Sequence, residues 1–189
     1  MLKNNFKALI LAAGFGTRLL PHTRFVPKAL FPVGGRPMID RIVDQLTNAG
    51  CTGIAVNTHH LSDQIAAFLD SRDHPVPVIH RYEPQLLGTG GAILNNADFL
   101  GHQPFVVINS DILTDMDISS AVQHHLSHPY PATLVMHDCP LFNKVCVNSR
   151  ELITGFSKNE GGPDCRHMAF TGVQVLDPDV YDYIRPNIF

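Results

Sequence analysis

Residues 8–18 read Ala8-Leu9-Ile10-Leu11-Ala12-Ala13-Gly14-Phe15-Gly16-Thr17-Arg18, an apolar run that ends in glycines. A short run without polar residues is typical of a strand buried on both faces, as in a parallel sheet. Residues 54–56 and 105–108 have the same character, and residues 132–136 are a fourth candidate. We therefore expect these strands to form the centre of a parallel sheet.

Helical segments are expected between these strands. Residues 37–49 place four apolar side chains on one face, and Gly50 suits the end of that helix. Further candidates are residues 62–69, with Ser62 as the expected N-cap, residues 90–97 and residues 117–128. The regular alternation predicts an α/β fold with a doubly wound, Rossmann-like mixed sheet sandwiched by helices.

The pattern changes after about Pro140. Residues 145–147, 152–153 and 169–176 resemble strands with few helices between them, so an antiparallel or mixed extension is expected within a single domain, residues 1–189. The sequence stops on the apolar pair Ile188-Phe189, which favours truncation at the C-terminus. This apolar end could also pack against a second copy, so a homo-oligomer stays open.

Composition excludes several classes of protein. The net charge is −3 without a Lys/Arg block, which argues against a nucleic-acid partner. Glycines interrupt the apolar N-terminal run, so neither a signal peptide nor a membrane span is expected. The four cysteines form no Cys-x-x-Cys pair, which favours reduced thiols and a cytoplasmic location.

The glycine loop predicts a polyphosphate ligand. Glycines let the backbone approach a ligand and point its N–H groups at phosphate oxygens, while Arg18 and Lys28 supply positive charge. A dinucleotide fingerprint would need glycine where Leu19 stands, and a kinase-type phosphate loop would need Gly-Lys-Ser/Thr. A tight turn that carries a surface arginine is the remaining alternative.

A family resemblance rests on this stretch and on three later ones. Gly14-x-Gly16-Thr17-Arg18-Leu19-x-Pro21-x-Thr23, followed by Pro27-Lys28, resembles the signature of sugar-1-phosphate nucleotidylyltransferases. Leu87-Gly88-Thr89-Gly90-Gly91-Ala92-Ile93, Asn109-Ser110-Asp111 and Ser157-Lys158 are similar to the family's nucleobase, metal and sugar-phosphate motifs. The resemblance covers nearly the whole chain, and it is greatest to the enzymes for N-acetylmuramate, mannose and heptose phosphates.

The resemblance implies a GT-A-like fold and a cytoplasmic enzyme of nucleotide-sugar biosynthesis for the cell envelope. Its partners would be a nucleoside triphosphate, UTP before GTP, and a sugar-1-phosphate, with Mg²⁺ as cofactor. Residues 1–139 would bind the nucleotide and residues 140–189, incomplete, the sugar phosphate. The implied catalytic residues are Arg18, Lys28 and Asp111. The implied nucleotide-binding residues are Leu11, Ala12, Ala13, Gly14, Gly16, Thr17, Glu83, Gly88 and Thr89. The implied sugar-phosphate residues are Asn109, Lys158, Thr171 and Gly172.

Asp111 is the candidate metal ligand. It follows a buried strand, and ligands of α/β sheets bind at the carboxyl ends of strands, where a carboxylate facing phosphates calls for Mg²⁺. A turn or capping aspartate, as expected for Asp115 and Asp117, is the alternative. The family also uses a second aspartate in a Trp-containing segment, and this sequence has no Trp.

The remaining polar candidates have plain alternatives. Glu83 could accept a base N–H, or it is a solvated loop residue. Lys158 follows Ser157 where the family often has Glu, so an exposed loop lysine stays open. Two groups of histidines are expected to be solvated rather than metal-binding: His124, His125 and His128, and the pair His59 and His60.

Two other functions stay open. A non-catalytic nucleotide or nucleotide-sugar sensor, or a truncated subunit, would keep the binding residues without turnover. A dehydrogenase is disfavoured by the glycine pattern and would require dinucleotide binding.

Overall fold

The structure is a computed structural model that describes residues 5–157, 160, 162 and 164–185. These form a large unit, which runs to Thr133 and resumes at Gln174, and a small unit, Leu134–Val173. Two features singled out in the sequence, Lys158 and the apolar chain end, lie outside the described residues. The functional division at residue 140 stays a prediction.

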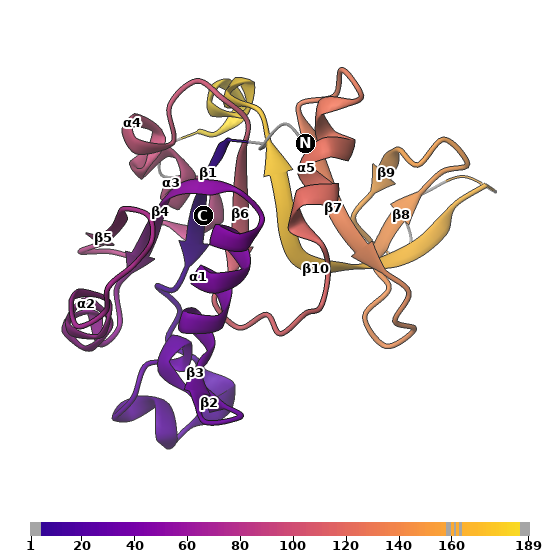
Figure 1. Ribbon diagram of the computed structural model, residues 1–189. Coiled ribbons are helices and arrows are strands. Elements are labelled where there is room, and N and C mark those ends of the chain that lie inside the picture. The colour runs from indigo at the N-terminus through magenta and orange to yellow at the C-terminus, as the bar shows by residue number, and fades with distance from the viewer. Residues whose placement is uncertain (1–4, 158–159, 161, 163, 186–189) are drawn as a thin grey trace. The chain divides into compact units, whose positions relative to one another are not determined.

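The large unit is built on a parallel sheet. Its strands are β1 (Phe6–Leu11), β4 (Cys51–Thr58), β5 (Val78–Tyr82) and β6 (Phe105–Asn109), side by side in the order β5-β4-β1-β6 (Figure 1). Ile10 of β1 pairs with Val56 on one side and with Ile108 on the other. The predicted parallel sheet is confirmed for the first three segments, and it brings the carboxyl ends of β1, β4 and β6 to one edge. The fourth candidate, residues 132–136, is not part of it: it forms β7 (Ala132–His137), which pairs with β10 (Arg166–Leu176).

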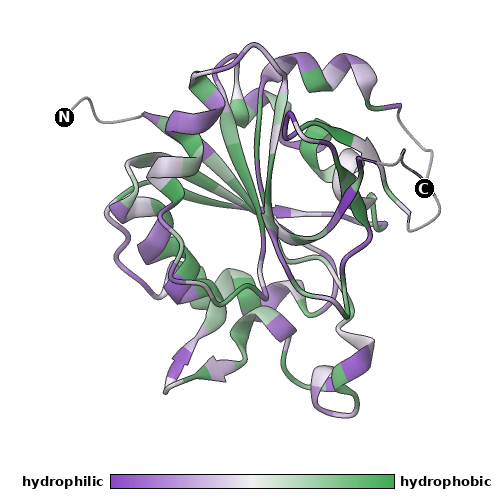
Figure 2. Cartoon of the chain, turned by 90° about the vertical axis from the view of Figure 1, so that its right-hand side faces the viewer, coloured by the Kyte–Doolittle hydropathy of each residue, from purple (hydrophilic) through white to green (hydrophobic). Residues whose placement is uncertain are grey.

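Helices and a small hairpin complete the large unit. The helices are α1 (Met38–Asn48), α2 (Ser62–Asp70), α3 (Gly88–Asn95), α4 (Ala97–Leu100) and α5 (Ile118–Leu126). Short 3₁₀ turns cover Thr17–Leu19, His22–Arg24, Lys28–Leu30 and Pro178–Tyr183, and strands β2 (Pro32–Val33) and β3 (Arg36–Pro37) pair with each other. Hydrophobic residues gather on the strands, and the helices alternate hydrophilic and hydrophobic faces (Figure 2).

Of the expected helix caps, two are found and one is not. Gly50, after α1, has the positive φ of 99° that favours glycine, and the Asp117 carboxylate caps α5 by accepting the Ser119 N–H at 2.9 Å. The prediction that Ser62 caps α2 is wrong, because Leu61 is the N-cap. Ser62 is instead buried, with its hydroxyl 3.0 Å from His80 Nε2.

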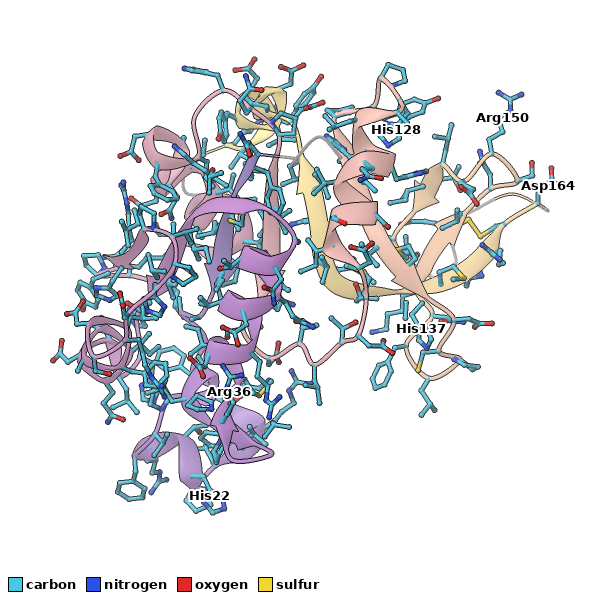
Figure 3. All side chains as sticks on the ribbon, in the orientation of Figure 1. His22, Arg36, His128, His137, Arg150 and Asp164 are labelled. Carbon is cyan, nitrogen blue, oxygen red and sulfur yellow. A yellow bond between two sulfur atoms is a disulfide. The ribbon has the colours of Figure 1, made fainter. Side chains whose placement is uncertain are left out.

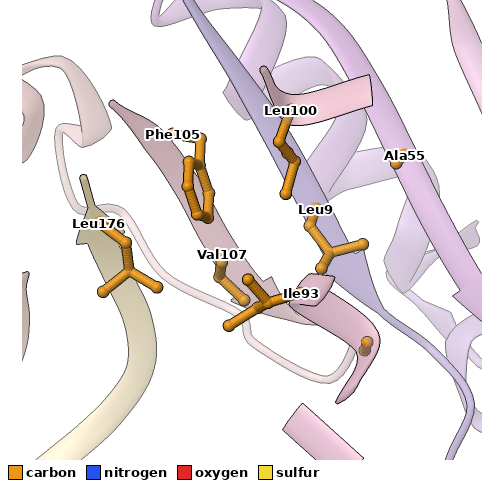
Figure 4. Close-up of a cluster of buried hydrophobic side chains, with 8 residues drawn as sticks. Leu9, Ala55, Ile93, Leu100, Phe105, Val107 and Leu176 are labelled. Carbon is orange, nitrogen blue, oxygen red and sulfur yellow. The ribbon is translucent and has the colours of Figure 1, made fainter. Parts of the chain in front are cut away.

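One core cluster joins the sheet to α3, α4 and the end of the chain. Leu9, Phe105 and Val107 pack with Ile93 and Leu100 of the helices, as the close-up in Figure 4 shows. Ala55, Ala92 and Leu176 complete the buried cluster. Leu9 and Phe105 are fully buried. Because strand side chains alternate, the neighbouring residues Ala8 and Ile10, also fully buried, show that the opposite face is covered as well.

The small unit is antiparallel, as predicted for the segment after Pro140. It contains β8 (Val145–Val147), β9 (Ile153–Gly155) and most of β7 (Ala132–His137) and β10 (Arg166–Leu176). β8 pairs antiparallel with both β9 and β10. The last residues of β10, from Gln174, belong to the large unit, where β10 follows β6 in the strand order.

The prediction of four reduced cysteines is wrong for one pair. A disulfide joins Cys146 and Cys165, whose Cα atoms are 5.4 Å apart (Figure 3). Their proximity follows from strand register, because Cys146 lies opposite His167 on β10, two residues beyond Cys165. Sequence spacing alone carries no such information. Cys51 and Cys139 are free.

Two of the three histidines at the end of α5 differ from the prediction of a solvated helix end, whereas His124 is exposed as predicted. His125 is 2% exposed, and its Nδ1 lies 2.9 Å from Thr133 Oγ1. His128, labelled in Figure 3, contacts the same hydroxyl through Nε2 at 2.8 Å. Thr133, in the first residues of β7, thus contacts both histidines. None of the described helices combines the length and apolar character that a membrane crossing requires.

Candidate nucleotide site

The glycine loop leaves the carboxyl end of β1 and is held by its own side chains. Gly16 has a φ of 62°, and a Cβ there would lie 2.8 Å from Thr23 Cγ2. Thr23 is buried and donates its hydroxyl to the Gly16 carbonyl at 3.1 Å. Glycine is therefore required at position 16 both for its backbone conformation and for the close approach of Thr23.

A pocket of about 360 Å³ opens against this loop. It is formed by the carboxyl ends of β1, β4 and β6, the glycine loop and the start of α3. The lining includes all three predicted catalytic residues, every predicted nucleotide-binding residue and Asn109: Leu11, Ala12, Ala13, Gly14, Gly16, Thr17, Arg18, Lys28, Glu83, Gly88, Thr89, Asn109 and Asp111. Segments up to 100 residues apart thus meet at the edge where α/β folds bind ligands.

Five lining residues were not predicted from the sequence: Leu19, Ala29, Asn57, Leu86 and Ser110. Leu19, Ala29 and Ser110 adjoin predicted residues, and Leu86 lies between the predicted Glu83 and Gly88, so these four could have been included with their motifs. Asn57 carries a separate signal, because it is a polar residue at the carboxyl end of the buried strand β4, beside the strand that feeds the glycine loop.

Two cations serve the pocket differently. Lys28 Nζ forms an ion pair with the Asp111 carboxylate, and the two side chains are 26% and 30% exposed. Arg18 lines the same pocket, is exposed, and makes no ion pair within the described residues. The Arg18 guanidinium is thus available to an anion, whereas the Lys28 ammonium already has a counter-ion.

Asp111 suits a magnesium ion that arrives with phosphates. Asp111 brings carboxylate oxygens, Asn109 and Ser110 add neutral oxygens, and Mg²⁺ prefers such hard ligands. No group of three or more His, Cys, Asp or Glu residues that could hold a metal occurs among the described residues. The donor set therefore fits Mg²⁺ with waters as further ligands, some of them replaced by phosphate oxygens once a substrate binds, which is the usual arrangement for Mg²⁺ on phosphate substrates.

Glu83 is not a solvated loop residue. It is 1% exposed, its Oε1 accepts a hydrogen bond from Asn57 Nδ2 at 2.8 Å, and its Oε2 accepts the Leu87 N–H at 3.3 Å. Asn57 is 3% exposed and its Oδ1 accepts the Ala12 N–H at 2.9 Å. These bonds join the start of the glycine loop to the loop before α3.

His59 and His60 anchor loops at the pocket rather than standing free in solvent. His59 Nδ1 lies 2.7 Å from the Glu83 carbonyl oxygen, and His60 Nε2 lies 2.6 Å from that of Thr23. Both rings also contact Phe15, with centroids 5.4 Å apart. Both side chains are half-buried, so the prediction that they are solvated holds only in part.

The predicted sugar-phosphate residues are distributed differently. Asn109 lines the pocket. Thr171 and Gly172 lie on the part of β10 that belongs to the small unit, where Thr171 Oγ1 donates to the Val135 carbonyl at 2.9 Å. The roles of these residues and of Lys158 stay predictions.

One protein family and several known proteins are similar to this chain. The family described as nucleotidyl transferase matches residues 7–140. An N-acetylmuramate alpha-1-phosphate uridylyltransferase from Neisseria meningitidis is 35% identical, with 95% of this chain and 78% of the relative covered. A mannose-1-phosphate guanyltransferase from Schizosaccharomyces pombe is 32% identical, with 96% of this chain but 52% of the relative covered. The chain thus spans about half the length of the latter.

The fold is also found in a solved structure. A putative glucose-1-phosphate thymidylyltransferase from Bacillus anthracis, crystallised with sucrose, superposes with a TM-score of 0.80 at 27% identity, over 94% of this chain and 73% of that one. The expected nucleotidyltransferase fold is confirmed.

Proposed function

The chain belongs to the nucleotidyl transferase family, and from this premise we propose that it joins a nucleoside triphosphate to a sugar-1-phosphate. The products are a nucleotide sugar and pyrophosphate. One observation carries the proposal: Arg18, Lys28 and Asp111 converge on one pocket beside a glycine loop.

The reaction needs charge neutralisation and alignment more than proton transfer. A phosphate oxygen of the sugar-1-phosphate attacks the α-phosphorus of the triphosphate and forms the new P–O bond. The bond from that phosphorus to the bridging oxygen breaks, and pyrophosphate leaves with the electron pair. The nucleophile is already an anion near neutral pH, so the chain has to supply no general base.

The pocket residues divide this work. Arg18 binds the β- and γ-phosphates and stabilises charge on the leaving pyrophosphate. Lys28 reaches the reacting phosphates, and Asp111 holds Mg²⁺, with Asn109 beside it. Mg²⁺, when bound, supplies Lewis-acid stabilisation of the phosphate oxygens. Backbone N–H groups of the glycine loop, residues 14–17, hold phosphate oxygens.

Substrate choice follows the relatives. Similarity to the uridylyltransferase from Neisseria favours UTP as the substrate of this chain. Similarity to the guanyltransferase from S. pombe makes GTP the next candidate. Lys158, Thr171 and Gly172 are proposed to bind the sugar phosphate. We also propose a cytoplasmic location for the reaction.

A binding protein without turnover is the second candidate. The observation that favours it is the metal site, because Asp111 is the only aspartate that lines the pocket formed by the described residues. Such a sensor would bind a triphosphate in the presence of Mg²⁺ and release no pyrophosphate.

Pyrophosphate release tests the proposal. The chain is incubated with Mg²⁺, each of UTP, GTP, ATP, CTP and dTTP, and a panel of sugar-1-phosphates. Release that requires one triphosphate and one sugar phosphate supports the enzyme and identifies its substrates. Asp111→Asn should abolish release, whereas the matched control Asp115→Asn, exposed and outside the pocket, should retain it. Magnesium-dependent binding without release would support the sensor instead.

A further inference from the structure

The pocket wall contains a buried carboxylate without a cation. Glu83 is 1% exposed, and among the described residues its carboxylate contacts no Lys, Arg or His side chain within ion-pair distance. Burying a carboxylate is costly unless hydrogen bonds compensate it. Here both oxygens are engaged, one by Asn57 Nδ2 and the other by the Leu87 N–H.

The bonds of this carboxylate continue to the opposite side of the pocket. Asn57 turns its amide N–H toward Glu83 and its amide oxygen toward the Ala12 N–H, at 2.8 and 2.9 Å. Ala12 begins the glycine loop, and Leu87 directly precedes α3. A continuous chain of hydrogen bonds, Ala12–Asn57–Glu83–Leu87, therefore connects the phosphate side of the pocket to the loop formed by residues 86–89.

We infer that Asn57 and Glu83 are positioning residues that fix the backbone of residues 86–89 for recognition of the nucleobase. Leu86, Gly88 and Thr89 line the pocket, and Gly88 has a φ of 65°. Glu83 thereby acts through the loop: its oxygens are already used by Asn57 and Leu87, and the base is read by the backbone groups that it holds in place. This inference rests on the proposed function.

The donor and acceptor pattern provides a stringent test. In Glu83→Gln, the new amide NH₂ must face either Asn57 Nδ2 or the Leu87 N–H, so two donors oppose each other. In Asn57→Asp, two carboxylates oppose each other. The double variant, Asn57→Asp with Glu83→Gln, restores every pair. The carboxylate introduced at position 57 would accept from the Ala12 N–H and from the amide introduced at position 83, and the oxygen of that amide would accept from the Leu87 N–H.

Three measurements separate positioning from a general structural role. The first is the Kd of the preferred triphosphate and of its competitors, measured by calorimetry. The second is the Kd of inorganic tripolyphosphate, which reports the glycine loop and Arg18. The third is hydrogen exchange of the Leu87 amide in the ligand-free chain, which needs no nucleotide. Thermal melting checks the fold, and Gln85→Ala, an exposed change in the same loop, is the matched control.

Each single variant should weaken binding of the preferred triphosphate by on the order of tenfold or more, because a charge-assisted hydrogen bond is replaced by a repulsive contact. Selectivity among the bases should fall with it. Tripolyphosphate binding should change by less than about threefold, since the Ala12 contact keeps an acceptor in every variant. Leu87 exchange should accelerate, and the double variant should restore affinity, selectivity and exchange protection.

Several outcomes would overturn the inference. One is a folded single variant with unchanged nucleotide affinity; another is a folded double variant that stays as weak as the single ones. Should a single variant not fold, the double variant decides alone, because only a matched pair predicts restored binding. A wild-type chain that binds triphosphate without turnover removes the enzyme proposal but leaves these comparisons intact. A wild-type chain that binds no triphosphate refutes both.

Discussion

The Lys28–Asp111 ion pair predicts that removing a positive charge from the pocket will tighten metal binding. Without nucleotide, Lys28 competes with a divalent cation for the Asp111 carboxylate. Fully exposed ion pairs contribute about 0–1 kcal/mol, and breaking a buried one costs about 3–5 kcal/mol. With side chains 26% and 30% exposed, this pair should contribute about 1–2 kcal/mol. Lys28→Met should then bind Mn²⁺ about 5- to 30-fold more tightly in the nucleotide-free chain.

The assay is a titration of the nucleotide-free protein with Mn²⁺, in which electron paramagnetic resonance measures the free ion. Lys28→Arg keeps the ion pair and should leave the Mn²⁺ Kd near that of wild type. Arg24→Met removes a nearby exposed charge outside the pocket and corrects for the change in net charge. Asp111→Asn should lose the site.

Triphosphate binding should change in the opposite direction. Lys28→Met removes a cation from the phosphate side, so the same variant that gains Mn²⁺ affinity should lose triphosphate affinity and turnover. An Mn²⁺ Kd that is unchanged or weaker in Lys28→Met would refute the view that lysine and metal alternate on Asp111. An equal gain of Mn²⁺ affinity in Arg24→Met would also refute this view, since the effect would then come from net charge.

Four further predictions concern the site, the core and individual titrating groups. Arg18→Ala should lower turnover by on the order of a hundred- to thousandfold while the melting temperature stays near that of wild type, because the exposed Arg18 makes no ion pair in the described part of the chain. Leu9→Ala should lower the free energy of unfolding in urea by about 2–5 kcal/mol, since Leu9 is fully buried in the main core cluster. Hydrogen bonds from the hydroxyls of Ser119 and Ser120 lower the pKa of Asp117 to about 2. Because this folded-state pKa is depressed, the stability it contributes is present above about pH 4 and is lost as pH falls toward 2, and a carboxyl NMR titration measures the midpoint. Burial raises the pKa of the Cys51 thiol to about 11, so iodoacetamide at about pH 8 should leave Cys51 unmodified in the folded chain and label it after unfolding.

The strands and the pocket edge could be predicted because local sequence determines them. A run such as residues 8–11 can be satisfied only by burial on both faces, and in a parallel sheet its carboxyl end must open toward a ligand site. Gly14 and Gly16, after β1, therefore identified the pocket. Asp111 could be assigned to the same pocket because it follows the carboxyl end of another buried strand, β6. These inferences need no knowledge of distant contacts.

The missed features all depend on register or on contacts between distant segments. Cys146 meets Cys165 only because β8 and β10 pair as they do. His125 is buried, and its ring contacts the Thr133 hydroxyl eight residues further along the chain. A solvated loop residue was one of two alternatives for Glu83, and its burial involves a hydrogen bond from Asn57, 26 residues away. Polar residues at strand ends are the signal that would have found Asn57.

The discontinuity of the large unit has a consequence for folding during synthesis. Residues up to 133 contain the parallel strands and the pocket, yet Leu176 belongs to the buried cluster, and Val180, Tyr181 and Ile184 pack against it. The Asp177 N–H also donates a hydrogen bond to the Pro131 carbonyl at 2.9 Å. The 40 residues of the small unit lie between these two residues in the sequence. The whole small unit must therefore be synthesised before the apolar residues that follow it, such as Leu176, can cover Phe105 and Val107. Until then the nascent chain exposes that cluster, and completing it requires closure of a long loop, the kind of step that slows folding and invites chaperone binding.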